Sequence, residues 1–194
     1  MWQLFQFPLC PFSRKVRLVM GEKGMGYELW RENPWEARDE FRAMNPAGTT
    51  PVLHDPEKGI TLADSRAICE YLEETVERNP LIIGTATARA EIRRLVALFD
   101  EVFYADVTAP LLSERMKKRL ILRQSPDSRM LREAMRLAHE HLYYIDYLGG
   151  LDWTGHEQAR AWYSVFKSRP SFRPLLTERM EVIQPPAHYA DVNA

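Results

Sequence analysis

The first residue that could do chemistry is a cysteine just after a short apolar run. Cys10 opens the segment Cys-Pro-Phe-Ser, which precedes a region of helical periodicity. The unpaired N–H groups and positive dipole end of a helix N-terminus would favour a thiolate there. Because Ser13 stands where a Cys-x-x-Cys motif has its second cysteine, such a site could form a mixed disulfide with a small thiol but could not resolve it internally. The alternative is a small buried residue at a strand end.

The second candidate is the segment Thr50-Pro51-Val52, in a loop that opens onto a strand. An X-Pro bond at such a place can be cis, and a cis bond would turn the backbone N–H and C=O of Val52 toward a site instead of a sheet partner. A peptide-like ligand could then pair with that backbone. The alternative is a trans proline that begins a strand.

The third candidate is the pair Asp64-Ser65, a carboxyl group followed by a hydroxyl group, at the start of a predicted helix. A carboxylate and a hydroxyl there can hold the ammonium and carboxylate ends of an amino acid, with free N–H groups completing the anion site. The alternative is that Ser65 acts only as the N-cap of the helix.

The elements that must position these residues alternate between strand and helix over the first 80 residues. Period-two and apolar runs predict strands, helical periodicity predicts helices, and Gly and Pro mark the turns. The predicted strands are 2–7, 27–31, 52–54 and 61–62, and the predicted helices are 13–24, 34–44 and one from Ser65 with Ile68, Tyr71 and Leu72 on its inner face.

The rest of the chain is predicted to be helical. Helical periodicity covers 90–102, 129–148 and 157–168, and Thr154 and Glu157 form a capping box before the last of these. Residues 81–87 form the expected linker, so the predicted domains are 1–80, thioredoxin-like α/β, and 86–194, all-α. Residues 184–194 contain two adjacent prolines and are predicted to be an extended tail.

Composition sets the broad class. The chain has 194 residues, of which 45% are hydrophobic and 27% charged, with a net charge of −1, so no overall charge drives binding to nucleic acid or anionic membrane. The two cysteines, Cys10 and Cys69, exclude a disulfide scaffold and fit a reducing cytoplasm. Neither a signal peptide nor an apolar run of the roughly 20 residues needed for a membrane helix is expected. No His or Cys cluster has metal-ligand spacing, because His139 and His141 would face different directions on a helix.

The order of these motifs resembles the glutathione transferase superfamily. The resemblance rests on Cys-Pro-Phe-Ser, on Asn-Pro-Ala-Gly-Thr-Thr-Pro-Val-Leu at 45–53, on Leu-Ala-Asp-Ser-Arg-Ala-Ile at 62–68, and on Ser-Arg-Pro-Ser-Phe-Arg-Pro at 168–174. It implies the two-domain transferase fold and a homodimer. In an active member, Cys10 would be the nucleophile or Ser13 would stabilise the glutathione thiolate, and the electrophile would bind against Tyr104. Glutathione would be held by Thr50, Pro51, Val52, Asp64 and Ser65.

Two departures from the family pattern weaken the expected glutathione contacts. The acid of the usual Glu-Ser pair is the shorter Asp64, and the loop before Pro51 has Thr49-Thr50 where Lys, Arg or Gln often contacts glutathione. A lost hydrogen bond to a charged group is worth roughly 1.5–3 kcal/mol.

The tail, Pro-Pro-Ala-His-Tyr-Ala-Asp at 185–191, resembles an alphaproteobacterial branch of the superfamily that binds FtsZ filaments and regulates their curvature and cell constriction. The resemblance implies a scaffold at the division site, and its candidate partner-binding residues are Trp35, Leu122, His188, Tyr189 and Asp191. The simpler alternative for Trp35 is that it covers the edge of the sheet. The basic run Lys117-Lys118-Arg119 with Arg123 would usually be a solvated helix end.

A helix expected from the resemblance is missing between Leu148 and Gly149. Similar chains run roughly 30 to 40 residues longer, and the missing helix would carry several core side chains worth about 1.5–3 kcal/mol each. Two alternatives are open: the protein has lost this helix, or the helix is part of the protein and is missing only from the sequence that was read.

Three functions follow from these patterns. The favoured one is a non-catalytic, FtsZ-binding division regulator, supported by the tail and the altered glutathione contacts. The second is a glutathione transferase or thiol-transferase, supported by the intact Cys-Pro-Phe-Ser segment. A reductase of the glutaredoxin type is disfavoured because Ser13 replaces the second cysteine.

Overall fold

The computed structural model describes residues 1–36, 38–141, 161, 164–165 and 167–177, without the side chains of 139–141. By its contacts the chain divides into two compact units. The first contains Met1–Ile83 and the segment that begins at Arg169, and the second begins at Gly84 and extends through Ser168. Among the helices of the described residues, none has the length and apolar character needed to cross a membrane.

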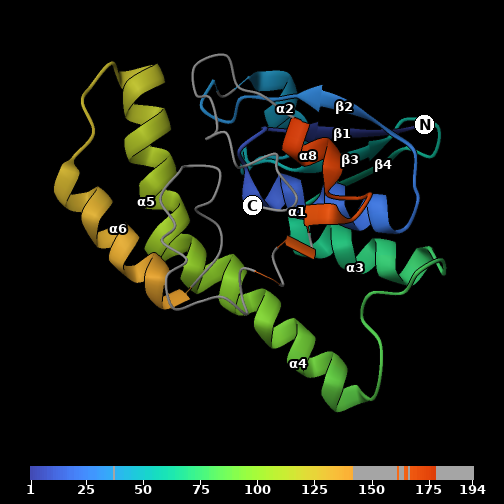
Figure 1. The fold of residues 1–194 in the computed structure, drawn as a ribbon. Coiled ribbons are helices and arrows are strands. Elements are labelled where there is room, and N and C mark those ends of the chain that lie inside the picture. The colour runs from blue at the N-terminus through green and yellow to red at the C-terminus, as the bar shows by residue number, and fades with distance from the viewer. Residues whose placement is uncertain (37, 142–160, 162–163, 166, 178–194) are drawn as a thin grey trace. The chain divides into compact units, whose positions relative to one another are not determined.

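The first unit is built on a four-stranded mixed sheet (Figure 1). Its strands are β1 (Trp2–Gln6), β2 (Tyr27–Arg31), β3 (Val52–Asp55) and β4 (Ile60–Ala63), in the order β2-β1-β3-β4. β1 pairs in parallel with β2, and β3 pairs antiparallel with both β1 and β4. The four predicted strands are therefore confirmed to within two residues at their ends.

Helices cover both faces of this sheet, as Figure 1 shows. The long helices α1 (Pro11–Glu22) and α3 (Ser65–Thr75) pack on one face, and the short helix α2 (Asp39–Met44) packs on the other. Alternate residues of a strand point to opposite faces, so Leu4 joins the core with α1 and α3 while Phe5 joins Phe41 of α2. This arrangement confirms the predicted thioredoxin-like fold. The buried side chains of the larger core are Leu4, Val16, Met20, Leu53, Ile68 and Leu72.

Two helix starts differ from the sequence prediction. α1 begins at Pro11 instead of Ser13, because proline fits the first helical turn, where its missing N–H has no partner to lose. α2 begins only at Asp39, since residues 33–36 form a turn in which the side chain of Asn33 accepts from the Trp35 N–H at 3.2 Å. Asn, Asp and Ser commonly close such turns on their own backbone.

In the second unit, one helical run extends from Ala86 to Leu122. It consists of α4 (Ala86–Ala97), the π-helical η1 (Leu98–Thr108), α5 (Ala109–Leu112) and the π-helical η2 (Ser113–Leu122), and α6 (Ser128–His141) follows. Thr85 caps α4, its side chain accepting from the Ala88 N–H at 3.2 Å. Pro110 removes one backbone donor within the run, and irregular turns beside an internal proline are the usual result.

The helical prediction for the second unit is confirmed where the structure describes it. The predicted helix 90–102 lies inside the long run, and 129–141 lies inside α6, whose Ala134 and Ala138 pack on Phe103 and Val107 of η1. The last helix that the structure describes, α8 (Arg173–Thr177), is grouped with the first unit. The Thr154 capping box, the gap expected after Leu148 and the tail 184–194 lie outside the described residues.

Candidate functional site

Cys10 lies where the sequence placed it, at the junction of β1 and α1. It is the N-cap residue of α1, with its carbonyl accepting from the Arg14 N–H at 3.0 Å, but its side chain makes no capping hydrogen bond. Instead Sγ donates to the carbonyl oxygen of Thr50 across 3.4 Å. The cysteine therefore contacts the residue that precedes Pro51, from a point 40 residues earlier in the chain.

The loop that carries Thr50 is held by an asparagine that the sequence analysis did not single out. The buried Asn45 donates through Nδ2 to the Thr49 carbonyl at 2.8 Å and accepts the Ala47 N–H at 3.2 Å. Gly48 has a φ of +65°, a conformation that glycine adopts without strain. The Asn-Pro-Ala-Gly segment could have signalled this role, because asparagine commonly bonds nearby backbone groups in turns.

The Thr50-Pro51 peptide bond is cis, as the sequence analysis allowed. The orientation predicted for Val52 is wrong, however. Val52 lies in β3, in register with Phe5 of β1 and Ala63 of β4, and its side chain is fully buried. Its backbone therefore has strands on both sides, and Thr50 is the residue whose carbonyl is directed at Cys10.

Asp64, and not Ser65, is the N-cap of α3, which corrects the cap assigned from sequence. Its Oδ1 accepts from the N–H groups of Arg66 at 2.8 Å and Ala67 at 3.1 Å. Its φ is +74°, a strained conformation for a residue with a side chain. Ser65 follows as the first residue of the helix and is buried. One carboxylate oxygen of the predicted ammonium-binding residue is thus engaged by its own helix.

Ser13 lies in the first turn of α1 and is fully buried. Its Oγ has no hydrogen-bond partner among the described residues. Buried hydroxyls are nearly always paired, so an unpaired one is a candidate for a ligand contact or a source of local instability. Because no part of Ser13 reaches the surface, a bound thiolate could contact this hydroxyl only after its neighbours move.

The sheet topology brings the three predicted motifs to one end of the sheet. Cys10 follows the carboxyl end of β1, Thr50 and Pro51 precede β3, and Asp64 follows β4. The register of Val52 with Phe5 and Ala63 places these three strand ends side by side. The residues predicted to form the site therefore lie near one another, at these three strand ends. Among the described residues, no group of His, Cys, Asp or Glu side chains could hold a metal ion.

The predicted partner-binding residues differ in exposure. Leu122 is exposed, at 48% of its surface. Trp35 is only half-buried instead of exposed, and its ring packs edge-on against Phe7 with 5.0 Å between centroids. That contact agrees with the alternative in which Trp35 covers part of the sheet. His188, Tyr189 and Asp191 lie outside the described residues.

Comparison with known proteins decides the family. Residues 9–75 match the family model described as the N-terminal domain of glutathione S-transferase. The FtsZ-localized protein A of Caulobacter vibrioides is 37% identical over 221 aligned positions, which cover 98% of this chain and 97% of that protein. This chain belongs to the glutathione S-transferase superfamily.

Several solved structures are similar to this chain over most or all of its length. A glutathione S-transferase from Rhodospirillum rubrum is 42% identical, with a TM-score of 0.94 and complete coverage of both chains. FzlA from C. crescentus is 35% identical with the same TM-score, covering 100% of this chain and 99% of that one. A glutathione-bound transferase from Methylobacillus flagellatus, 22% identical with a TM-score of 0.63 over 90% of this chain and 98% of that one, shares the fold.

The alignment with FtsZ-localized protein A also bears on the expected missing helix. Its 221 positions exceed the 194 residues of this chain, so the relative has residues within the aligned region that this chain lacks. This agrees with the expectation that similar chains are longer.

Proposed function

We propose that this protein is a non-catalytic member of the superfamily that binds FtsZ filaments in the cytoplasm and regulates their curvature and cell constriction. The observation that supports this most is the extent of similarity to FtsZ-localized protein A. The family model matches residues 9–75 alone, whereas the similarity to that protein covers 98% of the chain. The shared features therefore include the second unit and reach beyond the glutathione-site motifs.

The geometry of the candidate site supports a scaffold over an enzyme. Ser13 is fully buried, and an oxygen of Asp64 is engaged by the first turn of α3. Cys10 Sγ is directed at a backbone carbonyl. Each residue that would serve glutathione chemistry thus has a structural contact or lies beneath the surface.

Co-sedimentation with polymerised FtsZ tests the proposal. The wild-type protein should pellet with filaments, while truncation after Gln184 or the substitution Asp191→Lys should leave it in the supernatant. Glu74→Lys, an exposed acid on α3, is the charge-matched control and should pellet normally. If the wild-type protein stays in the supernatant, or the truncated and full-length proteins pellet equally, the proposal fails.

A second comparison tests Leu122, the exposed apolar residue that was predicted to contact the partner. Leu122→Asp should reduce co-sedimentation. Met130→Asp is the matched control, because Met130 is exposed to nearly the same extent as Leu122, 46% against 48%. It should not reduce co-sedimentation, because Met130 is not among the predicted contacts. Equal losses from both substitutions would remove Leu122 as a specific contact.

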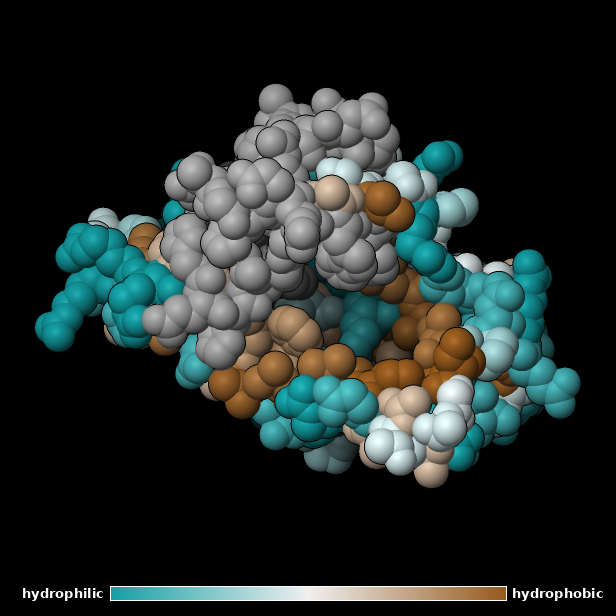
Figure 2. All heavy atoms as spheres, turned by 60° about the horizontal axis from the view of Figure 1, so that its bottom comes forward, coloured by the Kyte–Doolittle hydropathy of each residue, from teal (hydrophilic) through white to brown (hydrophobic). Residues whose placement is uncertain are grey.

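We also propose that the protein is a homodimer. Leu95, Phe99 and Val102 are exposed apolar residues at helical spacing on the run from α4 to η1. The face of the molecule drawn in Figure 2 also includes hydrophobic residues at its surface. Exposed apolar patches of this kind commonly mark protein interfaces. Phe99→Asp should convert a dimer to a monomer in multi-angle light scattering, while Met130→Asp should not; a wild-type monomer would refute this.

Glutathione conjugation or thiol transfer is the second candidate function. It is favoured by the intact Cys-Pro-Phe-Ser segment at 10–13 and by the 42% identity to the R. rubrum protein named as a glutathione S-transferase. Retention on immobilised glutathione, with turnover of chloro-dinitrobenzene that is lost in Cys10→Ala or Ser13→Ala, would establish it in place of the non-catalytic proposal.

A further inference from the structure

The polypeptide leaves the first unit after Ile83 and returns to it at Arg169. Both segments meet the same place in that unit, the C-terminal end of α1. Two adjacent residues there, Glu22 and Lys23, make the contacts, and they lie at the opposite end of α1 from Cys10. With 12 residues in the helix, these two ends are about 18 Å apart.

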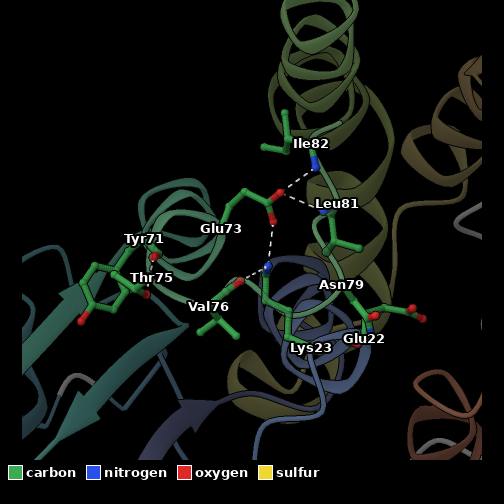
Figure 3. Close-up of polar contacts among 9 residues, drawn as sticks. All are labelled: Glu22, Lys23, Tyr71, Glu73, Thr75, Val76, Asn79, Leu81 and Ile82. Atoms are coloured by element: carbon green, nitrogen blue, oxygen red, sulfur yellow. Dashed lines mark hydrogen bonds and ion pairs between the residues drawn. The ribbon is translucent and has the colours of Figure 1, made fainter. Parts of the chain in front are cut away.

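Lys23 holds the outgoing segment through a shared carboxylate, as Figure 3 shows. Its side chain is fully buried, and Nζ lies 2.9 Å from Oε2 of Glu73 and donates to the Val76 carbonyl at 2.9 Å. The other carboxylate oxygen, Oε1, accepts the backbone N–H groups of Leu81 and Ile82, both at 2.8 Å. Glu73 therefore joins a buried cation to the two residues just before the first crossing.

Glu22 holds the returning segment. Its carboxylate accepts from Nε of Arg169 at 2.8 Å, from Nη2 of the same residue at 2.5 Å, and from the hydroxyl of Ser171. The backbone of Ser171 also lies close to Gly21, where a Cβ would come within 3.1 Å of the serine Cβ and 3.2 Å of its Cα. The second crossing is thus fixed by a charge pair and by close backbone contact.

The two sets of contacts share little besides the end of α1. Asn79 is one link, since its Nδ2 donates to the Glu22 carbonyl at 2.7 Å (Figure 3). The carboxylates of Glu22 and Glu73 have different cationic partners, Arg169 and Lys23. A buried ammonium needs its counter-charge, and backbone N–H groups removed from water need an acceptor, so losing either carboxylate affects its own crossing first.

We propose that Glu22, Lys23 and Glu73 form a two-point anchor at the end of α1, in which Glu73 holds the outgoing crossing closed and Glu22 holds the returning crossing closed. Each crossing then opens locally when its own carboxylate is lost. The anchor is a conformational device that limits local opening where the chain passes between units, independent of the Cys10 site and of the FtsZ proposal.

Amide hydrogen exchange of the full-length protein, followed by NMR, tests the anchor. In Glu73→Gln the amides of Leu81 and Ile82 should exchange about tenfold faster or more, with Phe172 and Arg173 little changed. In Glu22→Gln the reverse should hold, because the amides of Phe172 and Arg173 bond to the Arg169 carbonyl in the returning turn. Glu74→Gln, an exposed neighbour of Glu73, is the matched control and should change neither set.

A double variant separates local opening from general unfolding. Lys23→Met with Glu73→Leu removes the buried charge together with its partner, yet still leaves Leu81 and Ile82 without their acceptor. Fast exchange at these two amides in a protein of near-normal stability supports the anchor. Wild-type exchange there, or equal acceleration of both crossings in either single variant, overturns it.

Discussion

The two ends of α1 differ in how completely their polar groups are paired. At the N-terminal end, the buried Ser13 hydroxyl has no partner in the described structure, and the Cys10 thiol has one described hydrogen bond, to the Thr50 carbonyl. At the C-terminal end, the side chains of Glu22 and Lys23 each contact groups from distant segments. Cys10 and Ser13, which carry the chemical signal in the sequence, thus make few polar side-chain contacts at their end of α1, whereas Glu22 and Lys23, which belong to no motif, bond to distant segments of the chain.

Removing the carboxylate of Glu73, the partner of Lys23 at the C-terminal end of α1, should have the largest effect on the free energy of unfolding. Glu73→Ala leaves the buried ammonium of Lys23 without its counter-charge, and breaking such a pair costs about 3–5 kcal/mol of unfolding free energy. Urea denaturation measures this. Glu74→Ala, the exposed neighbour, should stay within about 0.5 kcal/mol of wild type, and a similar loss in both variants would contradict the comparison.

Acid should weaken the same end without substitution. The hydrogen bond from Arg169 lowers the pKa of Glu22. Burial raises the pKa of Glu73, but hydrogen bonds from the Ile82 N–H, from Lys23 and from the Leu81 N–H outweigh the effect of burial, so the pKa of Glu73 is also lowered. Carboxyls with pKa values lowered by folding stabilise the protein above their unfolded pKa, about 4.3, and this stability is lost as pH falls through the lowered values. Urea unfolding between pH 7 and pH 3 should show it.

Substitution in each carboxylate should reduce that acid sensitivity. Glu22→Gln and Glu73→Gln should each be less stable than wild type at pH 7, with the gap narrowing below about pH 4 as the wild-type carboxyls become protonated. A gap that stays constant across this range would show that neither pair titrates with folding.

Asp64 should give a smaller loss. Asp64→Ala removes the acceptor for the Arg66 and Ala67 N–H groups and keeps a side chain at positive φ, so a loss of about 1–2 kcal/mol is expected. Asp64→Gly should lose less, because glycine adopts this φ freely. If Asp64→Gly unfolds at a lower temperature than Asp64→Ala, backbone strain at this position is unimportant.

Ser13 should give the smallest effect. Because its buried hydroxyl has no partner in the described structure, Ser13→Ala should leave the free energy of unfolding unchanged or raise it by up to about 1 kcal/mol. A loss above about 1 kcal/mol would show that the hydroxyl is paired in solution, and would make the two ends of α1 more alike than the structure indicates.

Much of the first unit could be predicted because its signals are local. The strand 27–31 was predicted with the observed limits, and the loop at Pro51 was located by its turn residues. The predictions were wrong where the outcome depends on backbone geometry. Asp64, and not Ser65, is the N-cap of α3, and Val52 pairs with a strand on each side. The same residue pattern fits either cap residue and either orientation of Val52, so the sequence alone could not choose between these alternatives.

The anchor had no such signal. Lys23 is an ordinary charged residue near a helix end, and its burial depends on Glu73 and Val76, some fifty residues later. Pairings at this separation leave no periodicity in the sequence. Residues 103–122 were not predicted to form a helix, so the π-type turns beside Pro110 were missed together with that stretch.

The return of the chain to its first unit has a consequence for synthesis. Glu22 and Arg169 are separated by 147 positions, and α8 comes later still. During translation the sheet can form early, but its partners from the far end of the chain emerge only when most of the polypeptide has been made. A nascent chain stalled before Arg169 would therefore expose the end of α1 that the finished protein covers.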